Sequence, residues 1–406
     1  MINAKYVDKL DHNIKVFYLA TILKGMAITM PHAVLTLIFL AKGISYAQIA
    51  SIQAFYSIAM VIFEFPSGVL ADKYRKKTIF ILSNIIMLCS YAIVLIFDSF
   101  YMLAFAWFIY GISNAFETGT IDAHIVISIK RTYDADKVHS KLEKFIGTGN
   151  SLASIASIVG AGLGFFLYQY ISVNIYYAML ILMFMSGLLV LFQYKYVDYK
   201  HNQKNIRLSN LVCNTIKELR NSAELRWIII AFGMLQMYIQ IHFQMWQSFF
   251  LDLGHSDQIF WGLYLLFQVL TIVVYKIPVL KWFTKYLPII SVLGIVSVIV
   301  MYFITNKWAI VLFYCIPVVI VFMFKYFLDL AYNTKVKEDN ISALTSLIST
   351  IMRGFGAATL LVASVIIKFF TLKILYLIFP IISIGAAALL SRKIIKSVFH
   401  NISKVR

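Results

Sequence analysis

Ionisable side chains inside long apolar stretches are the first sign of chemistry in this sequence. Seven of them lie in such stretches: Lys24, Glu64, Glu117, Asp122, Lys325, Asp329 and Arg353. A charge at the centre of a membrane helix costs roughly 3 kcal/mol on insertion scales, so it usually faces a cavity or a partner of opposite charge. A carboxyl group in such a place can bind and release a proton, and a guanidinium group can hold an anion. These residue types therefore indicate proton or ligand handling.

A second polar feature is a series of glutamines in the segment QMYIQIHFQMWQ, residues 236–247. Gln236, Gln240 and Gln244 are spaced by four residues, so on a helix they share one face, and Gln247 follows one turn further along. Two explanations stay open for these amides. They line a water-filled cavity and form hydrogen bonds with a substrate there, or they form hydrogen bonds between helices, each worth only about 0.6 kcal/mol.

The elements that position these side chains are predicted to be membrane-spanning helices. The chain has 406 residues, of which 61% are hydrophobic and 13% are charged. Apolar runs of about 20 residues recur along it, long enough to cross the hydrocarbon as helices and too long for the strands of a membrane barrel. We place twelve spans at 14–40, 46–71, 78–97, 100–128, 142–168, 172–194, 227–251, 257–277, 286–305, 308–332, 341–367 and 372–391.

The net charge of +18 indicates how the chain is oriented in the membrane, and it does not indicate nucleic-acid binding. Of the 36 Lys and Arg residues, 29 lie in the two terminal tails and in alternate connections between spans. Lys42, Lys307, Lys368 and Lys373 lie in the remaining connections. This bias follows the positive-inside rule and predicts that both termini are cytoplasmic, with contact to anionic lipids as a side effect.

The longest polar stretch divides the spans into two sets of six. We expect an N-terminal six-helix bundle at 1–196, a cytoplasmic linker at 197–226 and a C-terminal six-helix bundle at 227–406 with a short cytoplasmic tail. No P-loop, HExxH, GxSxG or paired metal-ligand spacing occurs, and the three cysteines form no metal motif. We therefore predict no enzyme activity, no metal and no cofactor. The glycines of GAGLG (160–164) are better explained by helix packing than by nucleotide binding.

One connection resembles the signature of a known family. The segment FEFPSGVLADKYRKK (63–77) is similar to the motif between the second and third helices of the major facilitator superfamily, and the run before it resembles a bacterial drug- and metabolite-efflux branch. Gly68, Asp72, Lys73, Lys76 and Lys77 match the motif. The resemblance implies an all-α fold of two six-helix bundles and a monomer in the bacterial cytoplasmic (inner) membrane.

In that family this connection is a cytoplasmic latch between the two halves, and the resemblance implies the same role here. Asp122 is the candidate partner of Lys76, the alternative being an ordinary interfacial charge. Glu64 lies next to the latch, and we expect it to be structural.

The family architecture also implies that the first, fourth, seventh and tenth helices line a central cavity. We expect this cavity to be lined by Gln236, Gln240, Gln244, His242, Trp246, Lys325, Arg353 and Phe116. For the aromatic residues, ordinary packing is the alternative. Arg353 meets an anionic group of the substrate or bonds backbone carbonyls. Lys325 and Asp329, four residues apart, form a gate or neutralise each other.

Glu117, Lys24 and Asp329 are the candidates for proton coupling. Burial favours the protonated form of Glu117, and a nearby Lys24 favours release of the proton. The alternative is a permanent ion pair between Lys24 and Glu117. We predict a proton-coupled antiporter that exports an amphipathic small organic molecule, a drug or a metabolite, by alternating access. The alternatives are a nutrient-uptake symporter and a non-transporting membrane sensor.

Overall fold

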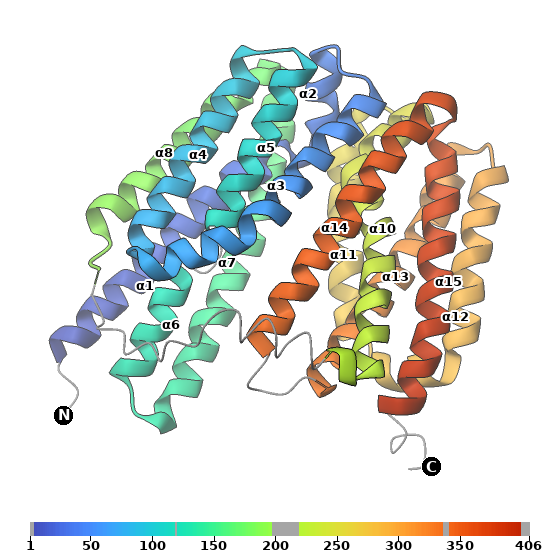
Figure 1. The fold of residues 1–406 in the computed structure, drawn as a ribbon. Helices are drawn as coiled ribbons and strands as arrows, with labels where there is room; N and C mark the ends of the chain where they lie inside the picture. Colours follow the sequence, from blue (N-terminus) through green and yellow to red (C-terminus); the bar gives the residue numbers. More distant parts are fainter. Residues whose placement is uncertain (1–3, 118–119, 197–218, 336–340, 399–406) are drawn as a thin grey trace. The chain divides into compact units, whose positions relative to one another are not determined.

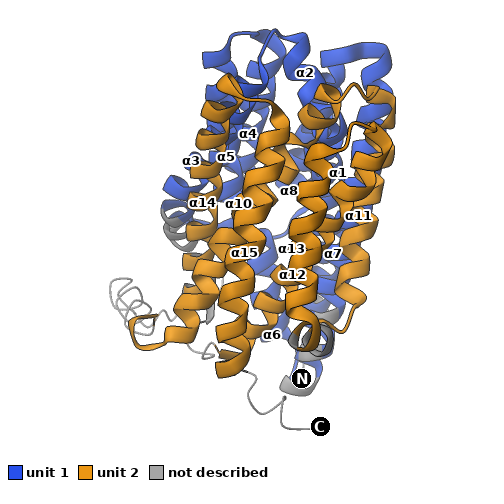
Figure 2. Ribbon diagram, turned by 90° about the vertical axis from the view of Figure 1, so that its right-hand side faces the viewer, with its two compact units in different colours: residues 1–200 blue, residues 201–406 orange. Residues whose placement is uncertain are grey.

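The chain folds entirely into helices where its structure is described (Figure 1). The computed structural model describes residues 4–117, 120–196, 219–335 and 341–398, and all regular structure in these ranges is helical. The chain divides into two compact units, residues 1–200 and 201–406 (Figure 2). Most of the predicted linker, residues 197–218, lies outside the described ranges.

Unit 1 contains the six spans predicted before the linker, two of them interrupted. Its elements are α1 (Ala4–Thr29), η1 (Met30–Ala33), α2 (Leu35–Ala41), α3 (Tyr46–Lys73), α4 (Lys76–Ile96), α5 (Phe100–Glu117), α6 (Ile121–Thr132), α7 (Ala135–Ile171), η2 (Ser172–Asn174) and α8 (Ile175–Gln193). The first predicted span, 14–40, is not a single helix. Pro31 lies in η1, where the ring removes a backbone donor and disfavours an α-helical conformation in the residue before it.

The fourth predicted span, 100–128, is also broken. α5 ends at Glu117 and α6 begins at Ile121, while residues 118 and 119 lie outside the described part of the chain. Thr120 has φ −93° and ψ −102°, which is not an α-helical conformation. Its hydroxyl donates to the carbonyl of Glu117 at 2.7 Å. The break therefore places the Glu117 side chain at a helix end.

Unit 2 contains the other six spans, each as one continuous helix. They are α10 (Ala223–Asp252), α11 (Phe260–Lys276), α12 (Val279–Phe303), α13 (Lys307–Lys335), α14 (Ile341–Phe369) and α15 (Leu372–Val398), with η3 (Asp257–Ile259) before α11. α10 packs against α13, α14 and α15.

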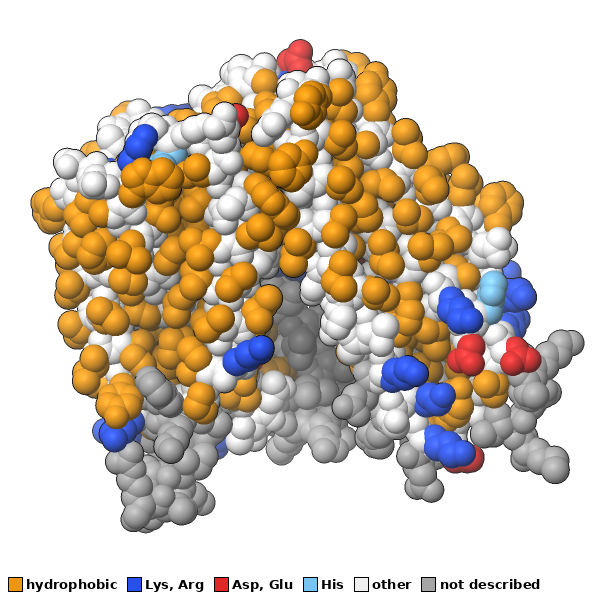
Figure 3. Space-filling model, turned by 180° about the vertical axis from the view of Figure 1, so that it is seen from behind, with side chains coloured by type: hydrophobic (Ala, Val, Ile, Leu, Met, Phe, Trp, Pro, Cys, Tyr) orange, Lys and Arg blue, Asp and Glu red, His pale blue; other side chains and the backbone are white. Residues whose placement is uncertain are grey.

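The surface of the helices is apolar. Tyr101, Phe192 and Phe303 are each more than three-quarters exposed, and Figure 3 shows hydrophobic side chains over most of the visible face. Such a surface suits lipid and not water. In the described part of the chain, ten segments are long and apolar enough to cross a membrane. One of them, Ser140–Gln193, includes both α7 and α8, and the broken α5–α6 pair is not among them. Counting α7 and α8 separately and adding the α5–α6 pair gives twelve spans in the described ranges. The protein is thus an all-α membrane protein of twelve transmembrane helices in two six-helix bundles.

Close helix contacts in unit 1 depend on glycine. A Cβ atom at Gly164 in α7 would overlap the carbonyl oxygen of Met30, and one at Gly160 would lie 2.7 Å from the Cα atom of Met26. Small residues let membrane helices approach closely. These contacts fit the packing role expected for GAGLG.

Three of the four lysines assigned to the non-cytoplasmic side bind carbonyls at the ends of helices. Lys42 donates to the carbonyl of Phe97 at 3.1 Å, Lys307 to Gly254 at 3.2 Å and Lys373 to Ile304 at 3.1 Å. These carbonyls follow α4, α10 and α12, where a cation complements the helix dipole. Helix capping is therefore a local reason for lysine at these positions.

Candidate functional site

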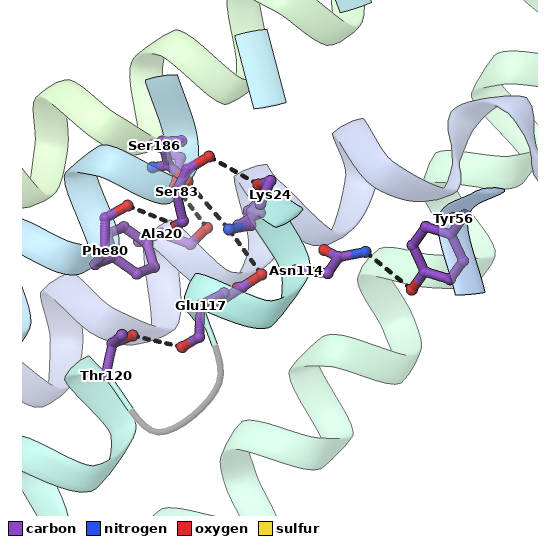
Figure 4. Close-up of polar contacts among 11 residues, drawn as sticks. Ala20, Lys24, Tyr56, Phe80, Ser83, Asn114, Glu117, Thr120 and Ser186 are labelled. Carbon is purple, nitrogen blue, oxygen red and sulfur yellow. Dashed lines mark hydrogen bonds and ion pairs between the residues drawn. The ribbon is translucent and has the colours of Figure 1, made fainter. Parts of the chain in front are cut away.

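The two residues predicted to carry proton coupling in unit 1 meet at the break in the fourth span (Figure 4). Nζ of Lys24 in α1 lies 2.8 Å from Oε2 of Glu117 at the end of α5. The side chain of Lys24 is 4% exposed, whereas that of Glu117 is 34% exposed. The cation is therefore enclosed by the bundle, while the carboxylate keeps access to its surroundings.

Lys24 has two further neighbours, both on α4. Its ammonium donates to Oδ1 of Asn84 at 3.1 Å and lies 5.0 Å from the centre of the Phe80 ring. A cation removed from water needs such partners, because its desolvation costs several kcal/mol. Asn84 was not among the predicted site residues, although an amide within the apolar run 78–97 is a visible signal.

Hydroxyl groups hold the helices around this pair in register. Ser186 in α8 donates to the carbonyl of Ala20 in α1 at 3.1 Å (Figure 4). Ser113 in α5 donates to the carbonyl of Ser83 in α4 at 2.7 Å. Hydrogen bonds of this kind join helices that the hydrophobic effect alone does not hold together in lipid. They fix the backbones from which Lys24 and Glu117 project.

Two other candidates of unit 1 lie in packing environments. Phe116, expected to line the cavity, lies in an apolar cluster with Ile79, Phe63 and Leu70. Its contacts favour the packing alternative. Glu64 lies on α3 one turn before Ser67, whose hydroxyl donates to the carbonyls of Glu64 at 2.9 Å and of Ala115 in α5 at 2.8 Å.

The predicted latch is described in part. The backbone of Gly68, Asp72 and Lys73 continues α3, but the side chains of Asp72 and Lys73 lie outside the described part of the structure. Lys77 donates to the carbonyls of Leu191 at 2.8 Å and Tyr194 at 2.9 Å, so it caps the end of α8. Its described contacts are thus inside unit 1.

Lys76 begins α4 and Asp122 lies in the first turn of α6, and their pairing stays a prediction. Next to Asp122 on α6, His124 lies 2.6 Å from the hydroxyl of Tyr194 and stacks on Tyr196 at 4.3 Å between ring centres. Asn13 in α1 exchanges two hydrogen bonds of 2.9 Å with the backbone of Lys195. The segment that leaves α8 is therefore held from three helices.

Unit 2 contains a pocket of about 350 Å³ between α10, α13 and α14. Four predicted residues line it together: Gln236, Lys325, Asp329 and Arg353. Lys325 and Asp329 form an ion pair of 3.0 Å, with side chains 28% and 38% exposed. Gln236 donates from Nε2 to Oε1 of Gln240 at 3.1 Å. The ladder of amides is thus partly satisfied along its own helix and partly presented to this pocket.

The other candidates on α10 lie elsewhere. His242 is buried among aromatic rings, including Phe267, Tyr314 and Phe322, and its Nδ1 lies 2.8 Å from the Tyr314 hydroxyl. Trp246 packs edge-on against Phe260 and Phe267. These contacts favour the packing alternative for both residues.

Gln244 is half-buried one turn after Gln240, and Gln247 is buried.

In the described ranges no group of three or more His, Cys, Asp or Glu side chains is arranged to hold a metal ion.

Comparisons with known proteins agree with this architecture. The model of the Major Facilitator Superfamily matches residues 17–360. An uncharacterised MFS-type transporter of Bacillus subtilis (strain 168), YxaM, is 26% identical over 251 residues, which span 60% of this chain and 60% of that protein.

Two solved transporters share the fold. A variant of the nucleoside transporter NupG matches 95% of this chain and 99% of its own with a TM-score of 0.70 and 15% identity. A bacterial homologue of the human lysosomal transporter Spinster, in an inward-facing and unoccupied conformation, matches 96% and 98% with a TM-score of 0.66 and 12% identity. At these identities the likeness concerns the fold alone. The match to the family model, which covers most of the sequence, shows that this chain belongs to the major facilitator superfamily.

Proposed function

We propose that this transporter exports an amphipathic small organic molecule in exchange for protons, and that Glu117 carries the proton. The observation that supports this most is the Lys24–Glu117 pair at the broken span. One partner is nearly enclosed and keeps a fixed place, while the other is accessible enough to exchange a proton. A coupling site needs this combination of a fixed charge and an accessible one.

The contacts of Lys24 suggest how the pair works. When Glu117 takes up a proton, Lys24 loses its counter-charge but keeps the Asn84 carbonyl oxygen and the Phe80 ring. Lys24 then lacks a negative partner. Its positive charge favours the ionised form of Glu117, so Glu117 releases the proton once the site opens to the other side. Alternating access by rocking of the two halves, the usual mode of such transporters, would provide that second opening.

The direction of transport rests on the similarity of residues 63–77 to the efflux branch. The alternative is an uptake symporter, for which the same pair would carry a proton inward with the substrate. A sensor that keeps the fold without coupled flux is the third possibility. We place the protein in the bacterial cytoplasmic membrane, with cytoplasmic termini, and expect it to act as a monomer.

Flux in proteoliposomes under an imposed pH gradient tests this function. The probes are naphthalenesulfonate, ethidium and uridine, with protein-free vesicles as the blank. Antiport accumulates a probe on the acidic side, symport accumulates it on the alkaline side, and a sensor produces no coupled movement.

Replacing Glu117 by Gln should abolish gradient-driven flux and spare exchange between labelled and unlabelled probe. The control is Glu224→Gln, which removes a carboxylate that pairs with Lys335 at 3.9 Å. Unchanged gradient-driven flux in the Glu117 variant would reject the carrier role.

A further inference from the structure

Unit 1 contains a tyrosine file, a series of four neighbouring tyrosine rings that crosses four helices. Tyr176 near the start of α8 lies 5.7 Å from Tyr91 in α4, measured between ring centres. Tyr91 lies 6.4 Å from Tyr110 in α5, and Tyr110 lies 5.1 Å from Tyr56 in α3. Each of these residues carries a hydroxyl group that can both donate and accept a hydrogen bond.

Aromatic packing alone does not explain the hydroxyl groups of the tyrosine file. Those of Tyr91 and Tyr176 have no hydrogen-bond partner in the described part of the chain, although the two residues are only 4% and 1% exposed. Nδ2 of Asn84, two turns before Tyr91 on α4, is buried in the same way. A buried polar atom without a partner costs about 1–3 kcal/mol, and phenylalanine would supply the same ring without that cost. Buried groups of this kind usually bind ordered water, which makes about three hydrogen bonds.

One end of the tyrosine file lies near an exposed connection and the other lies near Glu117. Tyr176 follows η2, whose residues are all at least partly exposed. With the proposed cytoplasmic termini, this connection after the fifth span is on the non-cytoplasmic side. At the other end, Nδ2 of Asn114 donates to the Tyr56 hydroxyl at 3.1 Å, and Asn114 lies one turn before Glu117 on α5 (Figure 4). Because the Tyr56 oxygen accepts this bond, its own O–H group can donate onward.

We propose that the tyrosine file, with ordered water at Tyr91 and Tyr176, conducts protons between the non-cytoplasmic side and the carboxylate of Glu117. The inference rests on the proposed role of Glu117 and adds the route by which the proton arrives. A proton that reaches the oxygen of Tyr176 displaces the proton already bound there toward the next oxygen, and the same exchange repeats along the file. Each tyrosine ends with one hydroxyl proton as before, and one proton neutralises the carboxylate. The proton therefore does not need the opening that admits the organic molecule.

Hydroxyl-radical labelling tests for the water. Radicals made by X-ray radiolysis oxidise buried tyrosines where water is bound beside them, and mass spectrometry of the purified full-length protein in detergent measures the rate at each residue. Tyr91 and Tyr176 should be oxidised several-fold faster than Tyr314 and Tyr376, which are also buried but whose hydroxyl groups already bond within the protein. Equal rates would overturn the proposal, and this measurement does not depend on transport.

Variants test the route in proteoliposomes under a pH gradient, with whichever of naphthalenesulfonate, ethidium and uridine the wild-type protein moves. Tyr91→Phe and Tyr176→Phe should each slow gradient-driven flux roughly 10-fold or more, because a positioned proton-transfer group contributes about 10²–10⁴-fold where that transfer limits the rate. The double variant should be no slower than the slower single variant, because two breaks in one route act as one. The matched control is Tyr376→Phe, which removes a buried hydroxyl group in unit 2 and should leave the rate unchanged.

The outcomes separate this inference from the proposed function. Unchanged flux in both single variants, while Glu117→Gln loses it, rejects the route alone. Additive losses in the double variant indicate damage to packing and also overturn the route. A wild-type protein without gradient-driven flux rejects the proposed function, and the labelling of Tyr91 and Tyr176 then supports or overturns the hydrated file.

Discussion

Removing the negative charge of Glu117 should destabilise the protein more than removing the positive charge of Lys24. The two side chains form one ion pair, but Lys24 is 4% exposed and Glu117 is 34% exposed. In Glu117→Gln the enclosed ammonium keeps its charge and loses its counter-ion. In Lys24→Met the remaining carboxylate can reach its surroundings or take up a proton.

The structure allows the size of the difference to be estimated. At 2.8 Å the gross Coulomb attraction is roughly 6 kcal/mol for an effective dielectric constant of about 20. Breaking a fully buried pair costs about 3–5 kcal/mol. Asn84 and Phe80 still hold Lys24, so we expect Glu117→Gln to lower the free energy of unfolding by about 2–3 kcal/mol. We expect Lys24→Met to lower it by about 1–2 kcal/mol, because Oδ1 of Asn84 loses its donor.

A double-mutant cycle measures these changes: the free energy of unfolding of each single variant and of the double variant is determined by denaturant titration in mixed micelles. The double variant should be about as stable as Lys24→Met alone, so the coupling energy should equal the effect of Glu117→Gln, about 2–3 kcal/mol. The reference cycle is the Glu224–Lys335 pair, with side chains 29% and 32% exposed and a separation of 3.9 Å. Its coupling should be at most about 1 kcal/mol. Additive effects at Lys24 and Glu117, or a greater loss in Lys24→Met, would refute the reasoning.

Two further predictions concern packing and pH. Gly164→Ala should lower the free energy of unfolding of unit 1 by about 1–3 kcal/mol, since the new Cβ atom overlaps the Met30 carbonyl. The control is Gly147→Ala on the same helix, whose new Cβ atom meets nothing within 4 Å and which should be neutral in the same denaturant titration. Burial lowers the pKa of His255, whose ring lies 3.1 Å from the carbonyl of Lys307 in a loop outside the spans. Because the unfolded chain then binds more protons, stability should be complete above the ordinary pKa of about 6.5 and fall as the pH drops below it. His255→Gln should flatten the change in melting temperature between about pH 7.5 and pH 5.5, and an equally steep change in that variant would contradict the assignment.

The fold could be predicted from the sequence because hydrocarbon imposes one strong rule on it. Every span must satisfy its own backbone, so each apolar run of the right length becomes a helix. The predicted spans of unit 2 accordingly appear as α10 to α15. In unit 1, hydropathy did not register the interruptions at Pro31 and after Glu117, since a window average hides a local change of backbone conformation.

The candidate sites were predictable in proportion to the cost of burying their side chains. Lys24, Glu117, Lys325 and Arg353 stood out because a charge in a span needs a reason, and the structure places each in a pair or a pocket. A neutral polar side chain costs less to bury, so it indicates a site less strongly than a charge does. His242 is accommodated by an aromatic cage drawn from several helices, and no spacing along one helix reveals that cage.

The unequal exposure of Lys24 and Glu117 argues against a purely structural tie. Replacing a buried ion pair by apolar side chains is often neutral or stabilising, so stability alone is a weak reason to keep a charge inside a bundle. A permanent tie also gains nothing from a carboxylate that stays one-third exposed at a helix break. A carrier needs that opening, and it needs the cation held by a third group while the carboxyl is neutral, as Asn84 does for Lys24. The two roles separate in the Glu117→Gln protein: a structural tie loses exchange together with gradient-driven flux, whereas a carrier loses only the response to the gradient.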